Sequence, residues 1–321
     1  MATLIETVSL TKFYKPSQIW ILSDLKSVKA VDNVSFKIEE GQIYGLVGES
    51  GCGKTTIGRL ILRLIEPTAG QVWFDGKNVM EFKSAEMKEY RRNAQIIFQN
   101  PFSSMNPRRT IFDSLSVGFD NYGMGSRTER KQWLEELMQR VGLEPDFLAR
   151  YPHQFSGGQL QRIVVARALS LKPRFIVADE PVASLDVSIQ AQILNLIRVL
   201  QEEYKFTLLF ISHDLRVIRH MSDSVGVMYM GSLVEKASKD ELFSRPKHPY
   251  TQALLDAAPR IELKPQVRGD LIQGEVWDKA PLDKGCVFYY RCTKRVDECM
   301  TTPQTLQEIG NDHQVACMRA V

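Results

Sequence analysis

The segment Gly48–Thr56, with the sequence GESGCGKTT, contains the residue types that bind phosphate. Glycines adopt backbone angles that other residues avoid, and they let main-chain N–H groups face an anion. In the pattern G-x-x-x-x-G-K-[ST], the lysine reaches the β- and γ-phosphates and the next hydroxyl ligates Mg²⁺. We therefore expect a nucleoside triphosphate to bind the whole segment, which consists of Gly48, Glu49, Ser50, Gly51, Cys52, Gly53, Lys54, Thr55 and Thr56.

Carboxylates and an amide follow two further apolar runs. Asp179 and Glu180 come directly after Phe175–Ala178, and Gln99 follows residues 94–98. In a phosphate-loop ATPase the first acid helps to hold Mg²⁺, and the second can activate the attacking water as a general base. The amide of Gln99 can ligate Mg²⁺ and sense the γ-phosphate. A solvated turn is the alternative interpretation for Asp179 and Glu180, and a turn-forming glutamine before Pro101 is the alternative for Gln99.

His213 and a Ser-Gly-Gly turn complete the candidate chemistry. His213 follows the apolar run 208–211, which would bring a neutral imidazole near a γ-phosphate. The residues Ser156, Gly157, Gly158 and Gln159 precede a helical stretch at 160–170 and could form a second anion site from N–H groups and a hydroxyl. If this site lies on a separate lobe from the phosphate loop, a second chain must supply the other half.

The elements that position these residues alternate along the chain. Short apolar runs predict buried strands at 43–47, 175–178 and 208–211, and helical spacing predicts helices at 54–65 and 188–204. Residues 4–12, 30–38, 71–75 and 94–98 are further strand candidates, and 14–29 reads as an irregular insert. The fold class expected is α/β, with a mostly parallel sheet covered on both faces.

Composition limits the possible functions. The 321 residues, 44% of them hydrophobic and 25% charged, indicate a globular protein of two or three lobes. A net charge of +3 is too small to indicate nucleic acid as a partner. We expect neither a secretory signal nor a membrane span, since no apolar h-region and no run of about 18 apolar residues occurs.

Four of the five cysteines crowd the end of the chain, at Cys286, Cys292, Cys299 and Cys317. In a reducing compartment, four clustered thiols suggest metal rather than disulfides. Thiolates can hold Zn²⁺ or an iron–sulfur cluster, but the C-x2–4-C pairs typical of structural zinc are missing. Spacing alone leaves a cluster, zinc and unliganded thiols open.

The ordered set of motifs resembles the nucleotide-binding subunit of ABC transporters over about residues 4–236. Gln99–Arg108 and the tail motif beginning Lys247-His248-Pro249-Tyr250 are similar to the oligopeptide/dipeptide transport ATPases. The resemblance implies a RecA-like phosphate-loop core, an antiparallel β subdomain and an α-helical signature subdomain at about 102–168. It also implies an ATPase domain over residues 1–245 and a small C-terminal extension over 246–321.

The same resemblance assigns roles and partners. Tyr14 would stack on adenine, Asp186 would lie in the loop that follows the catalytic acids, and the four tail cysteines would hold a [4Fe–4S] cluster, with zinc as the alternative. ATP and Mg²⁺ are the expected cofactors. A second ATPase subunit, two transmembrane permease subunits and, indirectly, an extracytoplasmic solute-binding protein are the expected partners. The chain would then lie on the cytoplasmic face of the membrane.

The cargo implied is a di- or oligopeptide, imported by a transporter. Relatives with this tail also move sugar oligomers or nickel, so these remain alternatives. A soluble ABC ATPase of translation or repair, and a non-catalytic partner of an active ATPase, are further alternatives. The single ATPase unit and the full set of catalytic residue types argue against both. Residues 100–122, which join Gln99 to the helical lobe, are the expected contact with a membrane subunit.

Overall fold

The computed structural model describes residues 2–14, 28–257, 284–310 and 312–320. Its internal contacts divide the chain into two compact units, which we describe separately. The helical unit comprises Met1–Ala2, Glu39–Gln42 and Glu81–Ile211. The phosphate-loop unit comprises Thr3–Ile38, Ile43–Met80 and Ser212–Val321.

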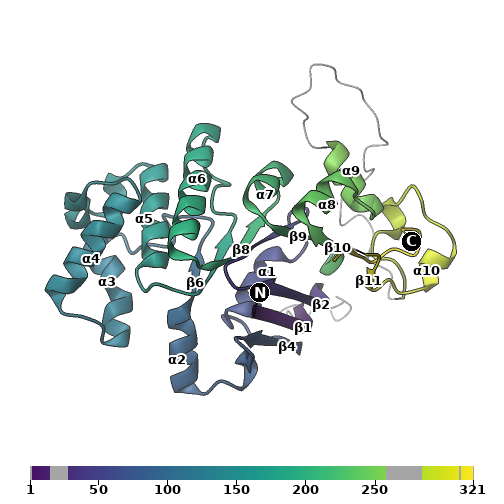
Figure 1. The fold of residues 1–321 in the computed structure, drawn as a ribbon, viewed down its shortest axis with the longest axis horizontal. Helices are drawn as coiled ribbons and strands as arrows, with labels where there is room; N and C mark the ends of the chain where they lie inside the picture. The colour runs from purple at the N-terminus through teal and green to yellow at the C-terminus, as the bar shows by residue number, and fades with distance from the viewer. Residues whose placement is uncertain (1, 15–27, 258–283, 311, 321) are drawn as a thin grey trace, which may run out of the picture. The chain divides into compact units, whose positions relative to one another are not determined.

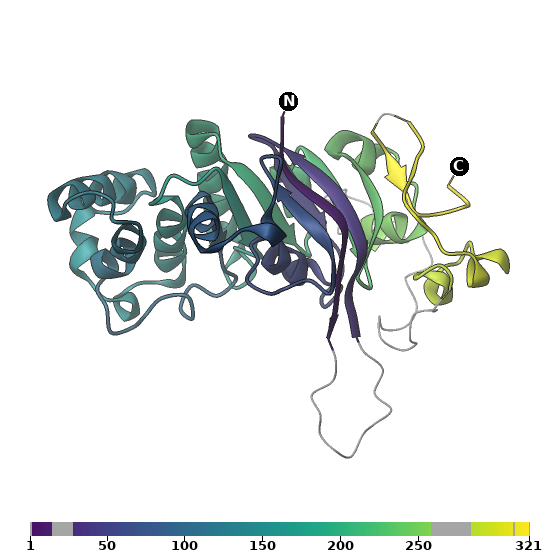
Figure 2. The ribbon, with the colours of Figure 1, turned by 90° about the horizontal axis from the view of Figure 1, so that it is seen from below.

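An antiparallel sheet forms the first layer of the phosphate-loop unit, with the strand order β2-β1-β4-β5. Figure 2 shows the long strands β1 and β2 running side by side. Buried side chains alternate with exposed ones at the end of β2, where Val34, Phe36 and Ile38 face the core. The bounds are β1 (Thr3–Tyr14), β2 (Val28–Glu39), β4 (Ala69–Phe74) and β5 (Lys77–Asn78).

The second sheet of this unit carries the phosphate loop. Strand β3 pairs in parallel with β9, and β10 pairs antiparallel with both β9 and β12. Every residue of β3 is buried, as expected for a strand covered on both faces. The bounds are β3 (Ile43–Val47), β9 (Ser224–Tyr229), β10 (Ser232–Ser238), β11 (Gln307–Glu308) and β12 (Gln314–Val315).

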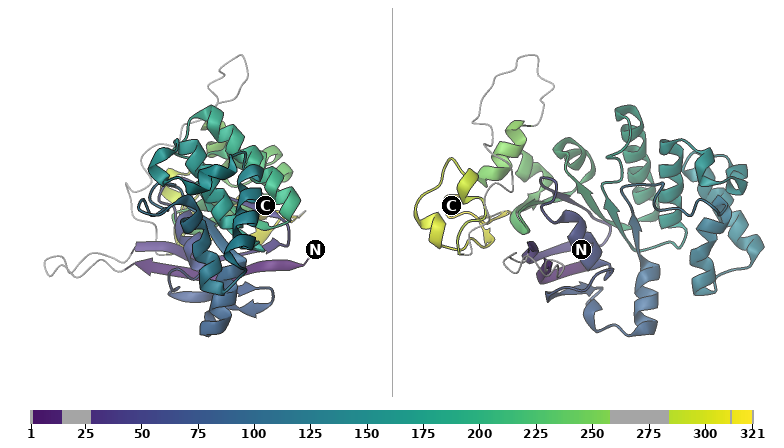
Figure 3. Two further views of the ribbon diagram at one scale, coloured as in Figure 1. Left: turned by 90° about the vertical axis from the view of Figure 1, so that its left-hand side faces the viewer. Right: turned by 180° about the vertical axis from the view of Figure 1, so that it is seen from behind.

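The phosphate-loop unit also contains helices, and two of them, α8 and α9, lie next to the C-terminal segment. The C-terminal segment, yellow in Figure 3, lies beside α8 and α9, and Lys294 Nζ donates to Gln252 Oε1 of α9 at 2.7 Å. The bounds are α1 (Lys54–Ile61), η1 (Val79–Glu81), α7 (Leu215–Met221), α8 (Lys239–Ser244), α9 (Pro249–Ala257), η4 (Tyr289–Arg291) and α10 (Glu298–Thr301).

The helical unit combines three parallel strands with a cluster of helices. Strand β7 pairs in parallel with β6 and with β8, and all residues of β7 and β8 are buried. Helices α3, α4 and α5 lie together in Figure 1. The bounds are α2 (Ser84–Asn93), β6 (Ala94–Ile97), α3 (Ile111–Tyr122), α4 (Arg127–Arg140), η2 (Pro145–Ala149), η3 (Pro152–Gln154), α5 (Gly157–Leu169), β7 (Phe175–Asp179), α6 (Val187–Tyr204) and β8 (Thr207–Ser212).

Three predicted element boundaries were wrong. The helix predicted at 160–170 begins earlier, because α5 starts at Gly157, directly after its N-cap Ser156. The helix predicted over 54–65 ends at Ile61, because Arg63 takes a left-handed φ of 48° and leaves Leu64 48% exposed. The insert predicted over 14–29 is narrower, since β1 continues to Tyr14 and β2 begins at Val28. Residues 15–27 lie outside the described part of the chain.

No helix among the described residues is long and apolar enough to cross a membrane.

Candidate functional site

The phosphate loop leaves β3 at Val47 and enters α1 at Lys54, the predicted strand-loop-helix arrangement. Gly53 has a φ of 106°, and a Cβ there would lie 2.1 Å from the carbonyl oxygen of Ala30. Only glycine fits such a position. The main-chain N–H groups at the start of α1 are those that bind an anion in loops of this type.

Lys54 lies inside the loop and is only 4% exposed. Its Nζ donates to the carbonyl oxygens of Gly48 at 2.7 Å and Glu49 at 3.0 Å. These bonds hold the ammonium group within the turn that the predicted phosphate would occupy. The Sγ of Cys52 lies 3.7 Å from Nζ, and burial raises the pKa of this thiol, so Cys52 is a neutral, buried side chain.

The predicted hydrolytic residues belong to the helical unit. Asp179 is the last residue of β7 and is buried, and Glu180 follows with a left-handed φ of 46°. Its N–H donates to Ile211 O at 3.0 Å, which fixes the turn against β8. Gln99 Nε2 donates to Glu180 Oε2 at 3.2 Å. The structure therefore joins the predicted γ-phosphate sensor to the predicted base, a contact that the sequence did not indicate.

Ser156 is the N-cap of α5, and the two glycines of the Ser-Gly-Gly turn are the first two residues of this helix. Its Oγ accepts the N–H of Gln159 at 3.3 Å, and Gln159 Oε1 accepts the N–H of Ser156 at 3.1 Å. This reciprocal capping box fixes the start of a 13-residue helix. A Cβ on Gly158 would lie 2.7 Å from Ile189 Cγ2, so only glycine allows this close contact with α6.

Three predicted residues stand at element ends. Tyr14 ends β1, is 42% exposed and has Lys12 Nζ 5.4 Å from its ring centroid. His213 is exposed and directly follows β8, and Asp186 is the N-cap residue of α6. Tyr14, His213 and the phosphate loop belong to the phosphate-loop unit. Gln99, Asp179, Glu180, Asp186 and the Ser156–Gln159 turn belong to the helical unit.

Two residues far along the chain bind the phosphate loop and were not predicted to do so. Tyr250 Oη accepts the N–H of Glu49 at 3.1 Å. Arg291 holds the Glu49 carboxylate with two bonds, Nη1 to Oε2 at 2.8 Å and Nη2 to Oε1 at 3.0 Å. Burial acts to lower the pKa of Arg291, but its bonds to Glu49 and Tyr229 outweigh that effect and raise it. The only sequence signal was the tail motif that contains Tyr250.

The four tail cysteines line one pocket, together with Phe288, Tyr289 and Met318. Burial, together with a smaller contribution from the other three thiols, raises the pKa of Cys286 to about 11. Burial also raises the pKa of Cys292 and Cys317. The donor set fits a group that binds thiolates, and loading would release protons. The free volume is about 10 Å³, the room of roughly one water, so a larger group requires the lining residues to move apart.

Within the described ranges, no group of three or more His, Cys, Asp or Glu side chains is arranged to hold a single metal ion. Neither the iron–sulfur cluster nor the zinc alternative therefore has a supporting metal-binding arrangement in these ranges.

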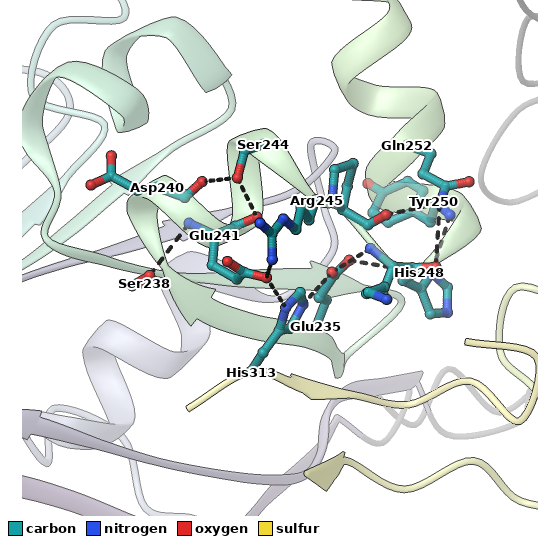
Figure 4. Close-up of polar contacts among 12 residues, drawn as sticks. Glu235, Ser238, Asp240, Glu241, Ser244, Arg245, His248, Tyr250, Gln252 and His313 are labelled. Carbon is teal, nitrogen blue, oxygen red and sulfur yellow. Dashed lines mark hydrogen bonds and ion pairs between the residues drawn. The ribbon is translucent and has the colours of Figure 1, made fainter. Parts of the chain in front are cut away.

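The buried carboxylate of Glu235, on β10, binds residues on both sides of the first three tail cysteines. Glu235 of β10 is fully buried and accepts the N–H groups of Lys247 at 2.7 Å and His248 at 2.9 Å. The Nε2 atom of His313, next to β12, lies 2.7 Å from Glu235 Oε1, and its Nδ1 atom lies 3.8 Å from Glu241 Oε1 (Figure 4). Burial lowers the pKa of His248 to about 3, and its neutral Nδ1 accepts the N–H of Tyr250.

A groove of about 780 Å³ opens on the helical unit. Part of it, Thr110, Phe112 and Asp113, falls within the segment 100–122 that we expect to contact a membrane subunit. The remaining lining residues come from α4 and η2: Arg127, Lys131, Glu135, Pro145, Asp146, Leu148 and Ala149.

Comparison with known proteins identifies the family. The profile described as "ABC transporter" matches residues 31–183, and that described as "Oligopeptide/dipeptide transporter, C-terminal region" matches residues 234–299. The oligopeptide transport ATP-binding protein AppF of Bacillus subtilis is 46% identical over 98% of this chain and 97% of its own length. A putative peptide import ATP-binding protein of Brucella ovis is 50% identical over 91% of this chain and 92% of its own.

Solved structures agree on the fold. The ATP-binding cassette MJ0796, in a dimeric post-hydrolysis state with ADP and Pi, matches with a TM-score of 0.65 and 29% identity, covering 74% of this chain and 99% of its own. The protein cbiO1 of Clostridium perfringens, part of the ABC transporter complex cbiONQ, matches in fold, with a TM-score of 0.66 and 23% identity over 76% of this chain and 92% of its own. With these relatives matched over nearly the whole length, the chain belongs to the ABC transporter ATP-binding proteins of the oligopeptide/dipeptide transport family.

Proposed function

We propose that the chain binds and hydrolyses ATP to drive the import of di- or oligopeptides through an ABC transporter. The observation that carries the assignment as an ATPase is the phosphate loop, in which the buried Lys54 donates to the carbonyl oxygens of Gly48 and Glu49. The peptide part is supported by the C-terminal match over residues 234–299 and by the relatives named for peptide import.

The proposed roles follow the geometry of each unit. Tyr14 stacks on adenine, the loop Gly48–Thr56 binds the phosphates, and Thr55, Gln99 and Asp179 hold Mg²⁺, which neutralises phosphate charge when bound. Glu180 takes a proton from the attacking water, and its bond to Gln99 links the base to the residue that senses the γ-phosphate. His213 stabilises the γ-phosphate end.

We propose that the working unit is a dimer. Each chain offers Ser156–Gln159 to the nucleotide of its partner, with Asp186 beside that interface. The capping box at Ser156 supports this role, because it fixes the start of α5, and the first main-chain N–H groups of a helix can bind an anion. A dimeric relative that contains ADP and Pi also supports it. The partner is a second ATPase subunit, which we expect to be a different chain.

Two permease subunits are the proposed membrane partners, which would hold the chain peripherally on the cytoplasmic face. The groove at Thr110, Phe112 and Asp113 supports this proposal, because it is concave, partly apolar and close in sequence to Gln99. An extracytoplasmic solute-binding protein would act indirectly. We also retain the proposed division into an ATPase domain, 1–245, and a C-terminal extension, 246–321.

We further propose that Cys286, Cys292, Cys299 and Cys317 hold a [4Fe–4S] cluster. The shared pocket and the mutual effects of the thiols on their pKa values support it. Anaerobic purification should give about four irons per chain and visible charge-transfer absorption. Stoichiometric zinc without iron, or neither metal, would overturn this assignment.

The function is tested by copurifying the membrane subunits and the solute-binding protein and reconstituting them in vesicles. We expect ATPase activity that rises when the solute-binding protein carries an oligopeptide. Stimulation by a sugar oligomer or nickel instead would keep the ATPase assignment and replace the cargo. No stimulation by any solute, with an active ATPase, would contradict the transport role.

A further inference from the structure

Glu49, the second residue of the phosphate loop, is held at both its main chain and its side chain by the C-terminal part of the protein. Tyr250 binds its N–H group, and Arg291 binds both oxygens of its carboxylate. Two parallel bonds between guanidinium and carboxylate fix orientation as well as distance. The loop is therefore positioned by residues that lie 201 and 242 positions away.

The Arg291–Glu49 pair is sheltered from solvent. The side chain of Arg291 is 10% exposed and that of Glu49 is 25% exposed. Arg291 Nη1 also donates to Tyr229 Oη at 3.4 Å. The ring of Tyr229 packs edge-on against Tyr250 at 4.7 Å and Phe288 at 5.1 Å between centroids. Such an aromatic surround fixes the guanidinium and strengthens its attraction to the carboxylate.

The charge of Glu49 matters because of its position. Lys54 Nζ donates to the main-chain oxygen of Glu49, so the carboxylate belongs to a loop built to hold phosphate. An unpaired carboxylate there would repel a nucleoside triphosphate. Arg291 cancels that charge.

The segment 288–292 also borders the cysteine pocket. Phe288, Tyr289 and Cys292 line it, and Arg291 immediately precedes Cys292. A shift of Cys292 would therefore act on the adjacent residue, Arg291, whose guanidinium binds the phosphate loop.

We propose that Arg291 is a positioning residue for ATP binding: it neutralises and orients Glu49, and it makes nucleotide affinity depend on the state of the four-cysteine pocket. The second half rests on the proposed role of the cysteines in binding a thiolate-bound group. Coupling of this kind is reciprocal, so ATP would also favour the pocket state that keeps Arg291 on Glu49.

The first test measures ATP affinity of the full chain by calorimetry for Arg291→Gln, Glu49→Gln and the double variant. We expect Arg291→Gln to weaken binding about tenfold, and Glu49→Gln to restore most of that loss in the double variant, because the repelling charge is gone. Arg245→Gln is the matched control, since Arg245 is an exposed arginine of the same unit, 3.8 Å from Glu241. It should bind ATP like the wild type.

An affinity of Arg291→Gln equal to that of Arg245→Gln would overturn the positioning role. An equal loss with and without Glu49→Gln would also overturn it, because Arg291 would then act through general stability. Thermal melting of each variant identifies such a loss. Rescue by Arg291→Lys should be partial, since lysine keeps the charge but not the two-bond geometry.

The second test replaces Cys292 with serine. We expect ATP affinity to change severalfold in the wild-type background and to stay constant in the Arg291→Gln background. If replacing Cys292 left ATP affinity unchanged in the wild-type background, or changed it equally in both backgrounds, the link to the pocket would be overturned. Iron content, measured on the same samples, reports separately on the cluster, so failure of the cluster assignment is distinguishable from failure of the Arg291 role.

Discussion

The phosphate loop and the Ser-Gly-Gly turn are both suited to bind phosphate, but they are stabilised over very different distances along the chain. The turn is closed by Ser156 and Gln159, three residues apart. The loop is braced by Tyr250 and Arg291, more than 200 residues after Glu49. A local cap keeps its shape whatever the rest of the chain does, whereas a distant brace can transmit a change from elsewhere.

Exposure also separates the phosphate loop from the residues proposed to act in hydrolysis. Lys54 is 4% exposed, and Glu49 is shielded by its bonds. Gln99 and His213 are exposed, and Glu180 is half-buried. We infer that the phosphate loop is already in place in the single chain, while the exposed residues need a partner chain to complete the proposed site.

Glu180→Gln gives the largest expected effect and divides binding from hydrolysis. Removing the base should lower ATP turnover about a hundredfold or more, because general bases contribute that much, and should leave ATP affinity unchanged. ATP turnover is measured on the reconstituted transporter, and ATP affinity is measured by calorimetry. A decrease below about tenfold would reject Glu180 as the base.

Lys54→Ala tests nucleotide binding by the phosphate loop. Loss of a charged hydrogen-bond donor should weaken ATP binding about tenfold to a hundredfold. Lys37→Ala, on the surface of β2 and paired with Glu6, is the control. If Lys54→Ala bound ATP as the wild type does, the loop assignment would fail.

Ser156→Ala tests whether the locally capped turn has more than a structural role. Loss of the cap should cost about 1 kcal/mol of unfolding free energy. It should also lower turnover about tenfold in the assembled dimer. Ser126→Ala is a close match, because Ser126 caps α4 through the same capping box with Glu129. Equal effects of both variants on turnover would leave Ser156 with its capping role only.

The smallest expected effect concerns His248, which accepts the N–H of Tyr250, one of the two residues that bind the phosphate loop. Its folded pKa of about 3 lies below the usual 6.5, so its stabilising contribution is full above pH 6.5 and is lost as the pH falls towards 3. Unfolding free energy should fall by up to about 1.36 kcal/mol per pH unit in this range. His248→Asn, which keeps an acceptor for Tyr250 N–H, should flatten this slope relative to His220→Asn. Identical slopes would exclude His248 as the acid-sensitive group.

Local patterns predicted much of the fold. The buried strands β3, β7 and β8, the helix α6 and the position of Glu180 one residue beyond its strand all follow from apolar runs and their ends. The resemblance to a known family, confirmed by the comparisons, added the expected function.

Contacts between distant segments could not be predicted. Nothing in the residues near Arg291 indicates a partner at Glu49, and Gln99 and Glu180 lie 81 positions apart. The early end of α1 also depended on the left-handed turn at Arg63, which has no glycine to signal it. Such features depend on packing after the chain has collapsed, and a pattern of single residues does not encode them.

The long span between Glu49 and Arg291 has a consequence for biosynthesis. The strand, loop and helix around Lys54 leave the ribosome early, but their brace does not exist until residue 291 has been made. His313 must follow before Glu235 gains its imidazole partner. A nascent or truncated chain would therefore have an unbraced phosphate loop, so that full nucleotide affinity marks a chain whose last segment is in place.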